Sequence, residues 1–233
     1  MFKGCRVGVV VPAYNEERQI DSVLATMPEF VDRIFVVDDG SSDETSNRVN
    51  LRAKKRGSHV ELIQHGNRRG VGAAITRGYR RSVEIGLDVV AVMAGDGQMD
   101  PNDLMLIIEP VTSGKADYSK GNRLFTGEAW RKTPAVRYLG NAFLSLLTKI
   151  ASGYWHIADT QSGYTAISAD ALRMLDLDRI YPYYGYPNDM LIRLNVHNLH
   201  VVGVNIDPRY GIGERSSMKV WKVVPTVDRK SVV

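Results

Sequence analysis

The chain has almost no cysteine and no long hydrophobic run. Cys5 is the only cysteine among 233 residues, so no internal disulfide can form, and a reducing cytosolic compartment fits best. No uninterrupted apolar stretch reaches the roughly 18 residues that a membrane-spanning helix needs. The first apolar run is short and leads straight into charged residues, so we expect no secretory signal peptide.

Two kinds of nucleotide-binding loop and the usual DNA-binding motifs are also missing. No Walker A sequence is present, and no glycine-rich loop follows the first expected strand, where a dinucleotide fingerprint would lie. The net charge of +4 and the pI of about 9.1 permit phosphate-rich partners. The basic clusters at 51–57, 67–69 and 79–81 do not form a pattern of basic residues interleaved with aromatic ones, so we expect solvated helix faces and no nucleic-acid partner.

Apolar runs alternate with segments of helical periodicity through the first half of the chain. Strands are expected at 5–14, 33–39, 59–65 and 87–93, and helices at 16–27, 41–57, 70–86 and 100–111. Strand and helix alternating four times are typical of a parallel sheet with helices on its faces. The sequence therefore predicts an α/β fold with a mainly parallel, twisted sheet.

The second half is less regular, but it contains no linker, internal repeat or low-complexity tract. The expected elements are a short strand at 116–124, a long amphipathic helix from about Pro134, a strand and helix over 163–175, a helix at 188–198 and a strand at 200–210. These features favour one domain rather than two.

Polar residues and glycines follow each strand of the first half. The segments are PAYNEE after the first strand, residues 38–41 after the second, GNRRGVGAA after the third and residues 96–98 after the fourth. Ligands of open parallel sheets bind beyond the carboxyl ends of the strands. We therefore expect the four segments to converge on one pocket.

The fourth strand ends on Asp96, which lies between Gly95 and Gly97. Glycines at these positions would let a bulky ligand approach the backbone closely. Asp96 and Gln98 are two residues apart, so on an extended segment their side chains point the same way. Carboxylate and amide oxygens suit Mg²⁺ or Mn²⁺, with water and ligand phosphates completing the coordination. The alternative is a turn in which Asp100 caps the next helix.

Two further pairs allow both a structural and a binding interpretation. Asp38 and Asp39 fit a turn before a helix, although the cap position itself falls closer to residues 42–43. One of the two carboxylates could instead accept hydrogen bonds from a nucleobase or a ribose. Gly70 and Gly72 fit tight turn geometry at a helix start, which is compatible with backbone contact to a base.

Five motifs, in this order, resemble those of family 2 glycosyltransferases: VVVPAYNEE, VVDDGSSDET, GNRRGVGAA, AGDGQMDP and DTQSGYTAIS. The resemblance covers about residues 6–220 and is greatest to the dolichyl-phosphate mannose synthase branch and its polyprenyl-phosphate relatives. It implies a GT-A fold over residues 1–218, with a nucleotide-sugar half to about residue 123 and an acceptor half from 124.

The resemblance also implies a reaction. A hexose, mannose or glucose, would pass with inversion from a GDP or UDP donor to a polyprenyl or dolichyl phosphate, with the help of Mg²⁺ or Mn²⁺. The acceptor would lie at the cytosolic face of a membrane. Two alternatives stay open: a glycan or protein hydroxyl as acceptor, or a non-catalytic nucleotide-sugar-binding module.

Site residues carry over by position. The nucleotide-holding positions are Pro12, Ala13, Tyr14, Glu16, Val37 and Asp39. The family's Asp-x-Asp-x-Gln element falls on Ala94, Gly95, Asp96 and Gln98, and its metal ligands match Asp96 and Gln98. The phosphate-binding arginines match Arg123 and Arg209. The chain departs from the pattern at Ala94, where an Asp is usual, and at Thr165, where an Arg is common.

The expected mechanism is an in-line displacement at the sugar. Arginine forks match phosphate oxygens bidentately, which suits Arg123 and Arg209. A phosphate monoester is largely a dianion at neutral pH, so this acceptor needs positioning more than deprotonation. A hydroxyl acceptor would need a general base. Asp159 and Asp189 are the candidates for that base or for orienting the acceptor, and Asp189 also fits a carboxylate in the first turn of a helix.

The last residues suggest contact with a membrane. Residues 219–233 contain Lys219, Trp221, Lys222 and several valines, a combination that suits a segment lying at a bilayer interface. A packed C-terminal element is the alternative. The sequence therefore predicts a cytoplasmic protein that is peripheral on the inner face of a membrane.

Overall fold

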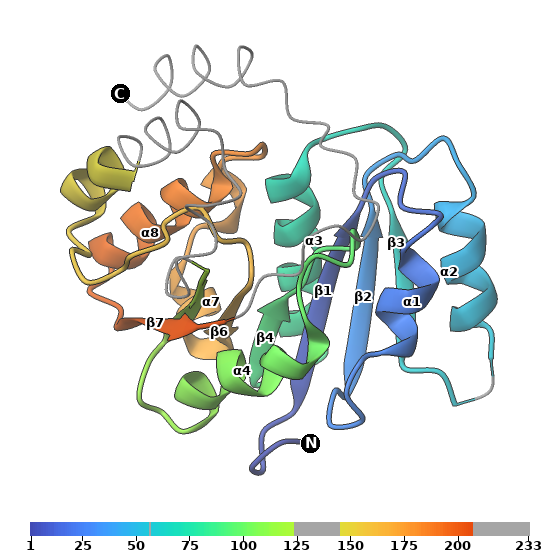
Figure 1. The fold of residues 1–233 in the computed structure, drawn as a ribbon, viewed down its shortest axis with the longest axis horizontal. Helices are drawn as coiled ribbons and strands as arrows, with labels where there is room; N and C mark the ends of the chain where they lie inside the picture. Colours follow the sequence, from blue (N-terminus) through green and yellow to red (C-terminus); the bar gives the residue numbers. More distant parts are fainter. Residues whose placement is uncertain (56, 124–144, 207–233) are drawn as a thin grey trace.

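The computed structural model describes residues 1–55, 57–123 and 145–206, and Figure 1 draws the fold. Its strands are β1 (Val7–Ala13), β2 (Arg33–Asp38), β3 (Val60–Gln64), β4 (Val89–Val92), β5 (Tyr118–Asn122), β6 (Thr165–Ser168) and β7 (Val201–Asn205). Its helices are α1 (Ile20–Ala25), α2 (Thr45–Ala53), α3 (Val71–Glu84), α4 (Leu104–Thr112), α7 (Ala169–Met174) and α8 (Tyr186–Val196), with short 3-10 helices η1 (Pro101–Asp103) and η2 (Leu177–Arg179). Residues 145–152 are also helical. None of the helices in these ranges is long and apolar enough to cross a bilayer.

One sheet runs through both halves of the chain, in the order β3-β2-β1-β4-β6-β5-β7. Neighbouring strands are parallel except at β6, which runs antiparallel to both β4 and β5. The predicted α/β fold with a mainly parallel sheet is therefore confirmed. The antiparallel direction of β6 was not predicted.

Helices cover both faces of the sheet (Figure 1). Along β1, Val9 and Val11 pack on the side of α1, α2 and α4, whereas Val10 packs on the side of α3, α7 and α8. Along β2, Val36 and Val37 divide between the two sides in the same way. Alternate residues of a strand point to opposite faces, so a run of buried valines fills both cores at once.

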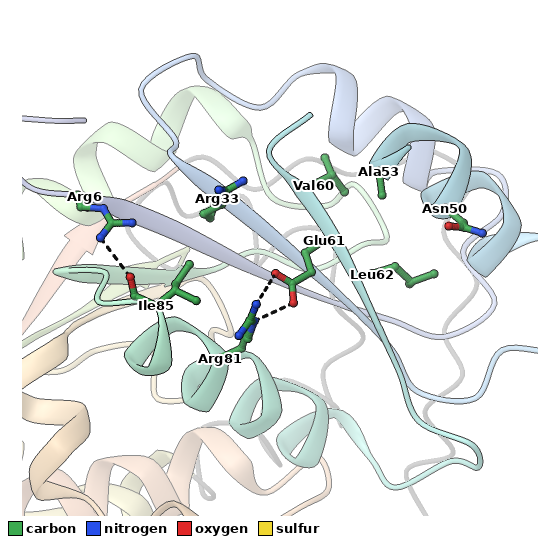
Figure 2. Close-up of a pocket in the computed structure, with 9 residues that line it drawn as sticks. All are labelled: Arg6, Arg33, Asn50, Ala53, Val60, Glu61, Leu62, Arg81 and Ile85. Carbon is green, nitrogen blue, oxygen red and sulfur yellow. Dashed lines mark hydrogen bonds and ion pairs between the residues drawn. The ribbon is translucent and has the colours of Figure 1, made fainter. Parts of the chain in front are cut away.

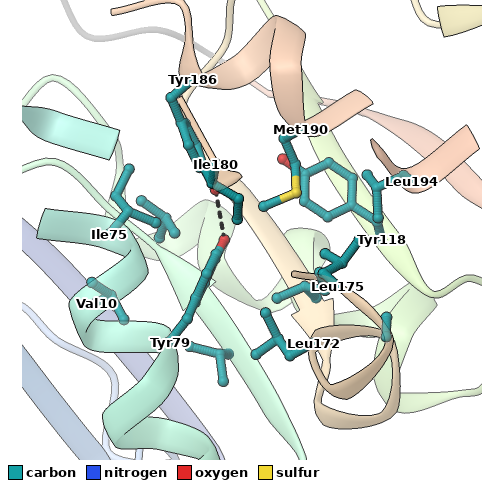
Figure 3. Packing of buried hydrophobic residues seen from close by; sticks show 14 of the residues in the cluster. Val10, Ile75, Tyr79, Tyr118, Leu172, Leu175, Ile180, Tyr186, Met190 and Leu194 are labelled. Carbon is teal, nitrogen blue, oxygen red and sulfur yellow. Dashed lines mark hydrogen bonds between the residues drawn. The ribbon is translucent and has the colours of Figure 1, made fainter. Parts of the chain in front are cut away.

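Large side chains join α3 to α8 in one of these cores (Figure 3). The hydroxyl oxygens of Tyr79 and Tyr186 are 3.0 Å apart and form a hydrogen bond. Burial raises the pKa of Tyr79 to about 12, so the phenol stays protonated. Because α3 belongs to the first half and α8 to the second, this contact fixes the two halves against one another.

Several helix boundaries follow the predicted capping chemistry. Asp100 accepts a hydrogen bond from the Asn102 N–H and caps η1, with Pro101 at its first position. Gly86 follows α3 with a φ of 72°, a conformation that favours glycine. The first helix differs from the expectation, because it begins at Ile20 and not near residue 16. The residues before it form a loop that is held by side chains of the next connection.

Candidate active site

Six segments with polar residues meet at one edge of the sheet. The connections after β1, β2, β3, β4 and β5 all leave from the carboxyl ends of parallel strands. Since β6 is antiparallel, the segment that precedes it, with Asp159, starts from this same edge. The first four segments thus meet at one edge of the sheet, and the topology adds Arg123 and Asp159 to them.

The loop after β1 is fastened to the loop after β2. The Asn15 N–H donates to the Ser41 hydroxyl at 2.9 Å, and the Ser42 N–H donates to the Asn15 side-chain oxygen at 2.8 Å. The Glu16 N–H donates to the Thr45 hydroxyl at 2.8 Å. Asn15 has a φ of 58°, which asparagine tolerates better than most residues. These hydrogen bonds hold the loops PAYNEE and DDGSSDET against one another.

Asp39 is buried and anchors the loop that leads into α3. Its carboxylate accepts the N–H groups of Arg69 and Gly70, each at 2.8 Å, and lies 2.9 Å from His65 Nδ1. Its own N–H donates to the Ala13 carbonyl at 2.9 Å. An ionised carboxylate offers about four acceptor positions, so three neighbours leave room for one further contact.

An aromatic ring and a guanidinium stack beside Asp39. The Arg68 guanidinium lies 4.0 Å from the centre of the Tyr14 ring, within the range of a cation–π contact. A Cβ at Gly40 would lie 2.9 Å from the backbone nitrogen of Arg68, so only glycine lets the backbone of residues 67–68 approach this closely. Pro12 and Val37 are paired in the register of β1 and β2. Val37 is fully buried between β1 and β3, so its side chain belongs to the core and offers no contact to a ligand.

The segment after β4 forms a turn, and the expectation of an extended segment was wrong. Gly97 has a φ of 75°, which reverses the chain direction, and Asp96 Oδ1 accepts the Gln98 N–H at 3.0 Å. The Gly95 N–H donates to the Pro12 carbonyl at 3.2 Å, which ties this turn to β1. Asp96 is half-buried and Gln98 is exposed, so the turn presents both residues at the sheet edge.

Glu16 and Asp96 repel one another across this edge. Burial, the charge of Asp96 and the charge of Asp43 together raise the pKa of Glu16 to about 7. Among the described residues no group of three or more His, Cys, Asp or Glu side chains is arranged to hold a metal ion. Two hard oxygen donors at a site of excess negative charge fit a divalent ion that takes its remaining ligands from water and from a diphosphate. The residues therefore fit the predicted Mg²⁺ or Mn²⁺, with Asp96 and Gln98 as donors.

Ala94 departs from the family pattern without disturbing this turn. Its side chain is half-buried, and its N–H points at the Met99 sulfur at 3.2 Å. No carboxylate lies at this position, so Asp96 is the charged residue of the segment 94–98.

Arg123 and Asp159 form an ion pair that the sequence did not predict as a pair. Arg123 Nε donates to Asp159 Oδ2 at 2.7 Å, and Nη2 donates to Oδ1 at 3.2 Å. Asp159 also accepts the N–H groups of Gln161 and Ser162. Burial would raise the pKa of Asp159, but the charge and hydrogen bonds of Arg123 and the charge of Lys120 outweigh it and hold the pKa below its usual value. Asp159 is therefore a stable carboxylate, and the Arg123 guanidinium is about two-fifths exposed.

Lys120 is the residue that sequence reasoning missed. It lies in β5, three residues before Arg123, and is 1% exposed. Its amino group donates to the Ser162 carbonyl. The sequence held one signal for its burial: Lys120 lies two residues after Tyr118, in a strand whose adjacent residues are buried. A buried lysine is rare, and no role was predicted for this residue from the sequence.

Asp189 lies in the first turn of α8, as its helix interpretation expected. Its Oδ2 accepts the Tyr181 N–H at 2.9 Å and the Arg193 Nε–H at 2.7 Å. The carboxylate thus fixes the segment before α8. One hydrogen bond links α8 to the Asp159 loop, from Gln161 Nε2 to Asn188 Oδ1 at 2.8 Å.

Gly70 and Gly72 lie against the tyrosine-rich segment before α8. A Cβ at Gly70 would lie 2.3 Å from the Pro182 carbonyl oxygen, and one at Gly72 would lie 2.2 Å from that of Tyr181. The Ala73 N–H donates to the Pro182 carbonyl at 3.2 Å. The close approach that requires these glycines is therefore made by the chain itself.

Three predicted features fall outside the described residues. They are Arg209, the second expected phosphate-binding arginine, the tail at 219–233, and the start of the helix expected from about Pro134.

A separate groove of about 450 Å³ opens beside the first strands (Figure 2). Arg81 Nε donates to Glu61 Oε1 at 2.8 Å, and Arg6 Nη1 donates to the Ile85 carbonyl at 3.1 Å. Arg6 immediately precedes β1, so the groove reaches the amino ends of the strands. Asp96 follows the carboxyl end of β4, and this groove is therefore not part of the candidate site.

Comparisons with known proteins give a consistent result. The model of the family described as Glycosyl transferase family 2 matches residues 8–175. The UDP-N-acetylglucosamine–dolichyl-phosphate N-acetylglucosaminyltransferase of Methanococcus voltae is 29% identical over 214 residues, which cover 87% of this chain and 85% of the relative. The undecaprenyl-phosphate mannosyltransferase of Micrococcus luteus is 33% identical over 191 residues, which cover 81% of this chain and 77% of the relative.

A solved structure shares the fold. Glucosyl-3-phosphoglycerate synthase from Mycobacterium tuberculosis, crystallised with Mn²⁺, UDP and phosphoglyceric acid, superimposes with a TM-score of 0.68 at 21% identity. The match covers 91% of this chain and 72% of that chain. The predicted GT-A fold is confirmed by this likeness.

Proposed function

Because the chain belongs to glycosyl transferase family 2 and is a glycosyltransferase, we propose that it transfers a hexose from a nucleotide-diphosphate donor to a polyprenyl phosphate. Relatives named for dolichyl-phosphate and undecaprenyl-phosphate transfer support the choice of acceptor. The observation that carries it is the Arg123–Asp159 pair, which lies at the same sheet edge as Asp96.

The pair suits an acceptor that is already anionic. Asp159 orients the Arg123 guanidinium and leaves part of it exposed, where it can meet phosphate oxygens. One phosphate oxygen attacks the anomeric carbon as the bond from that carbon to the donor diphosphate breaks. The nucleoside diphosphate leaves with the electron pair, and the configuration inverts. No proton has to be removed from a phosphate dianion, so positioning is the main requirement.

The alternative acceptor, a hydroxyl group, needs a general base that this site does not favour. The pKa of Asp159 is held low by Arg123, which makes the carboxylate a weak base. Asp189 already accepts hydrogen bonds from Tyr181 and Arg193. Both observations favour the phosphate acceptor.

Asp96 and Gln98 would hold the divalent ion, with Glu16 close enough to add to the negative field. A bound Mg²⁺ or Mn²⁺ would offset the charge that grows on the departing diphosphate. For the nucleotide, we propose that the loops after β1 and β2 bind the base and ribose. Tyr14 supplies a ring, and Asp39 has one acceptor position left.

A lipid acceptor also requires a membrane surface, and the second half of the chain offers an apolar one. Leu146, Leu147, Ile150 and Trp155 are each 46% to 60% exposed. Leucine and isoleucine on a helix at 145–152 and a tryptophan in the turn that follows it suit a bilayer interface. We propose that this segment meets the cytosolic face of the membrane, so that the protein is peripheral there.

A transfer assay tests the proposal. Radiolabelled GDP- and UDP-hexoses are offered with a short-chain polyprenyl phosphate or the matching polyprenol, in Mg²⁺, Mn²⁺ or EDTA. We expect metal-dependent transfer to the phosphate and none to the alcohol. Transfer to the alcohol or to a glycan, with the phosphate ignored, would overturn the proposed acceptor.

Two variants locate the chemistry. Asp96→Asn should lower the turnover number at least 100-fold, because it removes the charged metal donor. Asp100→Asn is the matched control, since it keeps a capping side chain on η1 and should stay near wild type. Asp159→Asn should keep donor affinity and lose turnover, whereas unchanged turnover would remove Asp159 from the mechanism.

A further inference from the structure

A lysine side chain is buried in β5, the strand that lies next to β7 at the end of the sheet order. Lys120 lies in β5, between β6 and β7, and is 1% exposed. Transferring an ammonium group out of water is expensive, and apolar replacements for buried charges are often more stable. A lysine at this position therefore calls for a role other than stability.

The amino group of Lys120 supports the Asp159 loop from within the core. It donates to the Ser162 carbonyl, and the Ser162 N–H in turn donates to Asp159 Oδ1 at 3.0 Å. Asp159 then holds Arg123 through two side-chain hydrogen bonds. A continuous chain of contacts thus runs from the buried amine to the exposed guanidinium.

The charges around this amine are few. Its register partners, Thr165 on β6 and Gly203 on β7, are uncharged. Among the described residues Asp159 and Arg123 are the charged groups that act on it. With a protonated amine the cluster carries a net charge of +1, two cations against one anion, and with a neutral amine it carries none.

We propose that Lys120 is a positioning residue for the acceptor phosphate: it fixes the Asp159 loop, and through it Arg123, and it supplies the excess positive charge beneath the phosphate. The proposal rests on the proposed function, because it concerns the same acceptor. Burial lowers the pKa of Lys120 to about 7, with Asp159 raising it and Arg123 lowering it further. The excess charge is therefore present below neutral pH and is lost as the pH rises.

The test compares Lys120→Met with Lys115→Met. Methionine keeps the length of the side chain, and Lys115 is an exposed lysine that precedes the same strand. The Michaelis constant for a short-chain polyprenyl phosphate is measured between pH 6.5 and 8.5, with the donor constant as internal reference. We expect Lys120→Met to raise the acceptor constant at pH 6.5 about 10-fold and to flatten its pH dependence, with Lys115→Met unchanged.

A purely structural role would change both Michaelis constants, or neither, and would leave the shape of the pH profile alone. Wild-type values for the acceptor and an unchanged profile in a folded Lys120→Met protein would overturn the proposal. If that variant does not fold, the wild-type enzyme supplies the test. A Michaelis constant for the acceptor that does not rise from pH 6.5 to 8.5 would then overturn the proposal. If the wild-type enzyme transfers nothing to polyprenyl phosphate, the proposed function fails first, and this role fails with it.

Discussion

Replacing Gly72 by alanine tests whether the segment before α8 lies against the start of α3. Gly72 is the second residue of α3, where alanine alone would favour the helix by about 1 kcal/mol. In the folded protein the new Cβ would lie 2.2 Å from the Tyr181 carbonyl oxygen and 3.0 Å from the Pro182 carbonyl carbon. Both are backbone atoms, so no side-chain rotation relieves the clash.

The segment cannot move away without losing other contacts. The Pro182 carbonyl accepts the Ala73 N–H, and the Tyr181 N–H donates to Asp189. Overpacking typically costs about 1 to 3 kcal/mol, and each lost hydrogen bond costs about 1 kcal/mol. After the helix gain is subtracted, we expect Gly72→Ala to lower the free energy of unfolding by about 2 kcal/mol.

Denaturation in urea measures this difference as a lower midpoint at an unchanged slope. Gly66→Ala is the control, because a Cβ there has nothing within 4 Å. It should stay within about 0.5 kcal/mol of wild type. If residues 181–182 pack on α3, Gly72→Ala lowers the free energy of unfolding; if they do not, the helix gain alone raises it. A Gly72→Ala protein that is more stable than wild type would therefore mean that residues 181–182 do not pack on α3.

Three further predictions concern stability and pH. Asp189→Ala should lower the free energy of unfolding by about 1 to 2 kcal/mol, seen in urea, because Tyr181 and Arg193 lose their acceptor; a value near zero would refute that role. The raised pKa of Glu16, about 7, means that the folded state binds this proton more tightly than the unfolded state does. The melting temperature without metal should therefore fall as the pH rises from 5 to 7, and Glu16→Gln should reduce that fall. Lys120 changes stability with pH in the opposite direction. Its pKa is lowered to about 7, so the folded state releases a proton that the unfolded state keeps. Stability should rise with pH above 7, and Lys120→Met should remove the rise.

The sequence pattern predicted the fold well because continuous apolar runs, at β1 and β2 for example, alternate along the chain with segments of helical periodicity. The direction of β6 could not be predicted in this way. Thr165–Ser168 is a short strand, and its alternation is the same whichever way it runs. Direction depends on the route of the preceding chain, and the helical periodicity expected there does not say at which edge of the sheet that chain ends.

The candidate site was predicted where a residue type and a strand end coincide, as at Asp39 and Asp96. Site contacts were not predicted where the two interacting residues are distant in sequence. Arg123 and Asp159 are 36 residues apart, and only the packing of β5 beside β6 joins them. Lys120 was missed for a different reason, because its burial depends on having a strand on each side.

The reversed strand decides which residues can act together. Asp159 precedes β6, whose amino end lies at the edge where β4 and β5 have their carboxyl ends. A parallel β6 would place Asp159 at the opposite edge, on the side of Arg6, at least the length of the strand away from Arg123. The ion pair could not form, and Lys120 would have no loop to support. The antiparallel strand is therefore the feature that brings the second half of the chain to the edge where Asp96 lies, and every proposed role of Asp159, Arg123 and Lys120 depends on it.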